Sequence, residues 1–153
     1  MTAEMALPDG LSGFGLYYHR GGYDLTDSSA GFLFDRYDRE GLFGNFTRDK
    51  FRIAGAYVRG KDHVETLPSK TIDGYFIQAD LHPIDWLVPF VRFDDVKTRD
   101  YTEENRTQKA TAGCSFRIFE NEISAGRMVL EVSRTKDSGL SANGALLGLL
   151  VAF

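Results

Sequence analysis

Long hydrophobic runs are missing from this sequence. No stretch of its 153 residues comes near the ~20 consecutive apolar residues that a membrane-spanning helix requires. Cysteine is nearly absent, and the single Cys114 excludes an internal disulfide and any metal site built on several thiolates. Proline is also scarce, with 4 residues against 16 glycines, 12 phenylalanines and 7 tyrosines. Because such a composition is typical of β-strands, we expect an all-β fold.

Recognisable catalytic motifs are lacking as well. The sequence contains no glycine-rich phosphate loop, no nucleophile elbow and no paired-cysteine metal spacing. The acidic pairs at 94–95 and 103–104 and the neighbours Asp62 and His63 are best explained as solvated charge at strand ends and in loops. We therefore expect no enzymatic activity, no cofactor, no metal site and no nucleic-acid partner.

The first ten residues carry no recognisable export signal. Residues 1–10 have neither a basic start nor an apolar run, so we interpret them as a lead segment before the strands of residues 11–153. An exported chain would then have lost its signal or would be the later part of a longer protein.

Apolar and polar side chains alternate with period two in segments of about ten residues. The clearest segment runs through Ala110, Ala112, Cys114, Phe116 and Ile118, which alternate with polar or small residues. Similar segments occur at residues 13–19, 42–47, 51–58, 74–81, 87–94, 127–133 and 143–153. A tilted strand that crosses a bilayer needs about 9–11 residues. The pattern predicts an antiparallel up-and-down transmembrane β-barrel of about eight strands, with residues 29–37 as a further candidate strand.

The connections and the aromatic residues suggest how such a barrel would lie in the membrane. Short connections at 48–50, 82–85 and 119–122 alternate with longer polar segments at 24–35, 61–70, 97–105 and 136–142. Membrane barrels have tight turns on one side, longer loops on the other, and aromatic residues at both interfaces. Phe153 is similar to the terminal aromatic residue that the barrel assembly machinery recognises in bacterial outer-membrane proteins, so we expect it to be an assembly signal.

The alternation produces one apolar and one polar face. A charge turned to lipid at mid-membrane would cost about 2–4 kcal/mol for Arg or Lys, and the apolar face carries none at mid-strand. The polar face would then line the pore, with these residues: Arg39, Arg52, Gln78, Asp80, Arg92, Asp94, Lys109, Arg117, Arg127 and Glu131. Six of them are cations and three are acids, which predicts a mild preference for anions.

Two parts of the sequence resemble a known family of membrane proteins. The first part is residues 35–37 (DRY) followed by 51–62 (FRIAGAYVRGKD), and the second is residues 74–80 (GYFIQAD) followed by 86–93 (WLVPFVRF). In this order they resemble the C-terminal part of phosphate-selective and related porins of the bacterial outer membrane, over residues 13–153. Since such porins are longer than this chain, the resemblance implies the C-terminal half of a larger barrel.

The patterns and the resemblance together predict an outer-membrane channel for passive diffusion of small solutes. Its expected partners are outer-membrane lipid and the barrel assembly machinery, with a homo-oligomer as one option. Three alternatives stay open: a closed eight-stranded barrel with a structural or adhesive role, a soluble lipocalin-like barrel that binds a ligand, and a barrel that sheathes a multihaem cytochrome.

Overall fold

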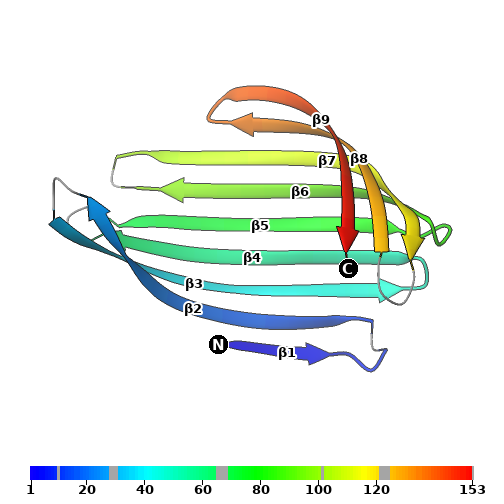
Figure 1. The fold of residues 1–153 in the computed structure, drawn as a ribbon, viewed down its shortest axis with the longest axis horizontal. Helices are drawn as coiled ribbons and strands as arrows, with labels where there is room; N and C mark the ends of the chain where they lie inside the picture. The colour runs from blue at the N-terminus through cyan, green and yellow to red at the C-terminus, as the bar shows by residue number, and fades with distance from the viewer. Residues whose placement is uncertain (10, 28–30, 65–68, 101, 121–124, 153) are drawn as a thin grey trace.

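The all-β class is confirmed by the computed structural model, which describes residues 1–9, 11–27, 31–64, 69–100, 102–120 and 125–152. Nine strands form one sheet in which each strand pairs antiparallel with its neighbours in the chain (Figure 1). The strands are β1 (Thr2–Ala6), β2 (Gly13–Asp27), β3 (Gly31–Arg48), β4 (Phe51–Val64), β5 (Lys70–Leu81), β6 (Leu87–Arg99), β7 (Glu104–Glu120), β8 (Ala125–Asp137) and β9 (Leu140–Ala152).

The sheet is open. β1 pairs only with β2 and β9 only with β8, so both edges are free within the described residues. Figure 1 shows the sheet bent, with β9 crossing in front of neighbouring strands. The up-and-down antiparallel order confirms that part of the prediction. The described strands do not close into the predicted barrel.

The number and length of the strands differ from the prediction. Residues 2–6 add the edge strand β1, and residues 31–37 begin β3 instead of forming a strand of their own. The strands β2 to β9 are 12 to 18 residues long, so they extend into segments that we had assigned to loops. The expected alternation of short and long connections is wrong, because polar residues in these segments stay paired in the sheet.

The described residues form no apolar core. None of the hydrophobic side chains that the structure describes is buried, and Ile77, Val91 and Leu147 are 53%, 57% and 67% exposed. The chain exposes 11112 Å² of surface, against about 7,800 Å² expected for a compact protein of 17.1 kDa. Among the described residues, therefore, no second layer covers the apolar side chains of the sheet.

Pro89 lies inside β6 without removing a hydrogen bond from the sheet. The amide of Arg117 donates to the carbonyl of Trp86 over 2.8 Å, so Trp86, Val88 and Phe90 point their backbone groups toward β7. Pro89 consequently points toward β5, and pairing with β5 ends at Asp80 and Phe90. This explains why a residue without an N–H is tolerated here.

The β8–β9 hairpin closes through a two-residue turn. Asp137 pairs with Leu140, and the residues between them, Ser138 and Gly139, have φ angles of 43° and 95°. Positive φ at both positions is the signature of a type I′ turn, which matches the twist of the paired strands. Residues 136–142 were expected to be a longer loop. This expectation is wrong, because β8 continues to Asp137 and β9 begins at Leu140.

We predict that Gly139→Ala lowers the free energy of unfolding by about 1 kcal/mol, because a side chain at φ of 95° is strained. Gly148→Ala in β9 is the matched control: its φ is not positive, and the nearest atom to a new Cβ is 4.0 Å away. Urea unfolding of both variants checks this. Equal stabilities of the two variants would contradict the turn assignment.

Candidate functional site

The register of the strands separates the side chains into two faces. In an antiparallel ladder, residues directly opposite each other point to the same side of the sheet. We call polar face the side that carries Arg52, Gln78, Arg92, Lys109 and Glu131, and apolar face the opposite side. All ten residues expected to line a pore lie on the polar face: Arg39, Arg52, Gln78, Asp80, Arg92, Asp94, Lys109, Arg117, Arg127 and Glu131.

A charged cluster occupies the middle of the polar face. Arg92 donates to both carboxylate oxygens of Asp94, with its shortest bond at 2.6 Å, and its guanidinium lies 4.2 Å from the centre of the Phe76 ring. Lys109 lies directly opposite Asp94 in the register of β6 and β7, and its Nζ is 3.8 Å from the Glu131 carboxylate. The four charged residues, Arg92, Asp94, Lys109 and Glu131, line a pocket of about 320 Å³. The cluster therefore brings two cations and two acids together on β6, β7 and β8.

A second cluster lies nearer the turn between β3 and β4. Asp80 is 5% exposed and accepts a hydrogen bond of 2.7 Å from the Gln78 amide. The Arg52 guanidinium lies 3.9 Å from the same carboxylate. Because Asp80 is nearly buried, these donors compensate for its lost hydration.

A third cluster lies on β2, β3 and β4, toward the strand ends that are far from the turn between β3 and β4. Arg39 forms an ion pair with Asp62 and lies 5.4 Å from the centre of the Tyr37 ring. The Tyr37 ring stacks on His19 with 5.6 Å between centroids. This part of the polar face therefore combines charge with aromatic surface.

The charges on the polar face are closer to balance than the sequence indicated. Asp62 pairs with Arg39, and Glu120 lies 2.6 Å from Arg117, so two acids join the three that we counted. Of the six cations, only Arg127 has no ion pair within the described part of the chain. Sequence reasoning did not place either acid on the polar face. Their polar neighbours indicated a loop for Asp62 and a turn for Glu120. The count that favoured anions is correspondingly weaker.

The apolar face is bordered at one end by a row of tyrosine–aspartate pairs. The hydroxyl groups of Tyr18 and Tyr57 donate to Asp38 and Asp73 over 2.8 Å and 3.0 Å. Tyr75 donates to Asp95 over 3.5 Å. Each tyrosine thus presents its ring beside the apolar residues and its hydroxyl toward charged ones, an arrangement that suits a boundary between apolar and aqueous surroundings.

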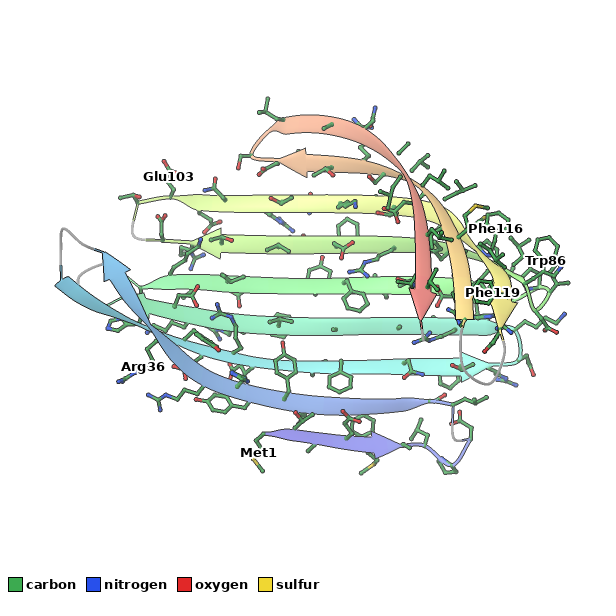
Figure 2. The ribbon with its side chains drawn as sticks, viewed as in Figure 1. Met1, Arg36, Trp86, Glu103, Phe116 and Phe119 are labelled. Carbon is green, nitrogen blue, oxygen red and sulfur yellow. The ribbon has the colours of Figure 1, made fainter. Side chains whose placement is uncertain are left out.

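At the other end of the apolar face lie further aromatic residues. Trp86 and Phe116 stack with 6.4 Å between ring centroids. Figure 2 shows Trp86, Phe116 and Phe119 together at one end of the sheet, and Arg36 and Glu103 at the opposite end. The expected assembly signal, Phe153, lies outside the described residues.

The tip of the β6–β7 hairpin is held by exposed charges. The Asp100 carboxylate accepts hydrogen bonds from the amides of Glu103 and Thr102, which lower its pKa below the ordinary value. Hydrogen bonds from Lys97 and Arg99 likewise lower the pKa of Glu104. Both groups support the hairpin as carboxylates, so their contribution is lost as the pH falls through these lowered pKa values.

Metal-binding side chains are not grouped together in the part of the chain that the structure describes. Its residues contain no group of three or more histidine, cysteine or carboxylate side chains that could hold a metal ion. They also contain no helix with the length and hydropathy of a membrane span. No protein-family profile matches the chain, and no curated protein matches it in sequence.

Asp95 is the most extensively bonded carboxylate of the tyrosine–aspartate row. It is 3% exposed and accepts hydrogen bonds from Arg106, at 2.5 Å for the shortest, from Gln108 at 2.8 Å, and from Tyr75. We predict that Asp95→Ala lowers the free energy of unfolding by about 1–2 kcal/mol, because three donors lose their acceptor.

The control for this prediction is Glu104→Gln on the same hairpin, whose carboxylate is half exposed and pairs with exposed Lys97 and Arg99. Glu104→Gln should lower the free energy of unfolding much less than Asp95→Ala does, since exposed ion pairs contribute little. Urea titration measures both variants. A loss for Glu104→Gln as large as that for Asp95→Ala would contradict the role given to Asp95.

Proposed function

We propose that this chain forms part of a porin-like β-barrel in the bacterial outer membrane, through which small solutes diffuse. The observation that carries the proposal is the exposed apolar face of a sheet with no buried hydrophobic side chain among its described residues. Burying apolar area contributes about 25 cal/mol per Å², so such a face requires an apolar environment. Hydrocarbon supplies it without a second protein layer.

The shape of the apolar face supports a bilayer as that environment. On each of β4 to β7 it has a run of residues without charge: Phe51, Ile53, Gly55 and Tyr57; Leu81, Ala79, Ile77 and Tyr75; Leu87, Pro89, Val91 and Phe93; Phe116, Cys114, Ala112 and Ala110. From Phe51 to Tyr57 the strand rises by about 20 Å, comparable to the ~25 Å apolar band of outer-membrane barrels. Aromatic residues flank this band at both ends, as expected at membrane interfaces.

The open edges also bear on the proposal. Unpaired backbone groups are not tolerated in hydrocarbon, so β1 and β9 require partner strands in a membrane. Further strands of a larger barrel would provide them, in keeping with the resemblance to longer porins. The polar face would then surround a water-filled lumen, where paired charges stay hydrated.

A second candidate function is a barrel that encloses a partner protein, such as the multihaem cytochrome considered above. The observation that favours it is that β9 carries exposed leucines on the polar face. Leu146 and Leu150 are 54% and 64% exposed there. Apolar side chains on an otherwise charged inner face fit a protein surface better than water. A lipocalin-like barrel has less support, because its apolar side chains would face a covered interior.

Conductance across planar lipid bilayers tests the channel. We expect the full protein to produce stepwise currents with weak ion preference in a salt gradient, because most of the charges on the polar face are paired. Arg127→Glu should shift the reversal potential toward cations, since Arg127 is on the polar face without an ion pair among described residues.

The control is Lys61→Glu, which makes the same charge change on the apolar face. It should leave the reversal potential unchanged. Absence of current steps would contradict the channel and favour the enclosing barrel, and an equal shift in both variants would contradict the assignment of the two faces.

A further inference from the structure

A groove floored by small side chains runs across the apolar face. In the register, Ala79, Val91, Ala112, Val132 and Ala145 form one row across β5 to β9. Three alanines in this row, with Ala110 in the next, leave a hollow of about 960 Å³ between larger neighbours such as Ile77 and Phe93. This volume is in the range of sites that hold small organic ligands.

The groove continues along the strands toward the Trp86 end of the sheet. A second hollow of about 850 Å³ shares Ala112, Val132 and Ala145 with the first and extends over Cys114 to Phe116. From Ala110 to Phe116 the strand rises by about 20 Å. That length exceeds half of the ~30 Å hydrocarbon thickness of a bilayer, so the combined groove can hold one extended acyl chain.

One end of the groove is cationic. Arg134 and Asn143 pair across β8 and β9 and line the groove, and Lys136 and Ser141 form the next row on the same face. Neither Arg134 nor Lys136 has an acidic partner in the described part of the chain. The neighbouring cations differ, because Arg106 pairs with Asp95, and Lys97 and Arg99 pair with Glu104.

We propose that this groove binds one phosphorylated lipid from the surrounding membrane. Arg134 and Lys136 bind the phosphate, with Ser141 and Asn143 as neutral hydrogen-bonding neighbours, and an acyl chain lies over Ala110, Ala112 and Cys114. Charge and shape agree, since an anionic head with an apolar tail matches a cationic end on an apolar groove. The proposal rests on the proposed function only in that the apolar face contacts lipid.

Native mass spectrometry of the full protein in detergent tests the site with two probes of equal chain length. Phosphatidylglycerol, which is anionic, should bind at one molecule per chain, and zwitterionic phosphatidylcholine should bind more weakly. Arg134→Gln with Lys136→Gln should weaken phosphatidylglycerol binding about tenfold or more, the effect of losing at least one charge-assisted contact. Phosphatidylcholine binding should stay nearly unchanged.

Two controls complete the test. Arg59→Gln removes a cation of the apolar face on β4, away from the groove and paired with Asp73, and should leave lipid binding unchanged. Ala112→Leu narrows the groove and should weaken binding of both lipids. An unchanged affinity for phosphatidylglycerol in the double variant, an equal loss in Arg59→Gln, or full displacement of the lipid by millimolar inorganic phosphate would overturn the proposal.

The outcomes are separable from those of the channel experiment. Lipid binding of this kind without current steps would leave the lipid site intact and contradict the pore. Current steps without selective lipid binding would support the pore and contradict the lipid site.

Discussion

The backbone hydrogen-bond register between neighbouring strands decides which side of the sheet each side chain reaches. A shift of one residue in any pair would move all side chains of that strand to the other face. From β2 to β9 the described register has a single irregularity, between Arg117 and Phe119 near the end of β7. This continuity brings Gln78, Arg92 and Lys109, from three separate strands, onto one face. The two-residue turn at Ser138 and Gly139 keeps β8 and β9 in the same register.

The separation of faces in turn determines how the charges and the apolar side chains are stabilised. On the polar face, Arg92 and Asp94 or Arg39 and Asp62 neutralise each other at the sheet surface. On the apolar face the described residues have no covering layer, so their stabilisation has to come from outside the sheet. In the proposed membrane location a bilayer would provide it over the uncharged band, and the tyrosine–aspartate pairs suit the plane where that environment ends. The alanine groove beneath Arg134 is a local departure from this even band.

The sequence was sufficient for the class of fold, for the approximate strand positions and for the two faces, because period-two alternation is a local signal. It was insufficient where the outcome depends on pairing between strands. Asp62 and Glu120 appeared to belong to connections, since polar composition alone does not separate a loop from a strand end. The hydrogen bonds from Tyr57 to Asp73 and from Tyr75 to Asp95 join neighbouring strands, so no pattern within one strand could reveal them.

The contact of the apolar face with lipid is tested most directly at Cys114 and Ser115, adjacent residues that point to opposite faces and are both half-buried. A small fluorophore would be attached to Cys114, or to Ser115→Cys in a Cys114→Ser background, before reconstitution into lipid vesicles. The account predicts that nitroxide groups on the lipid chains quench the label at 114 and that aqueous iodide quenches the label at 115. Quenching of the label at 114 by iodide, with no effect of the lipid nitroxides, would contradict it.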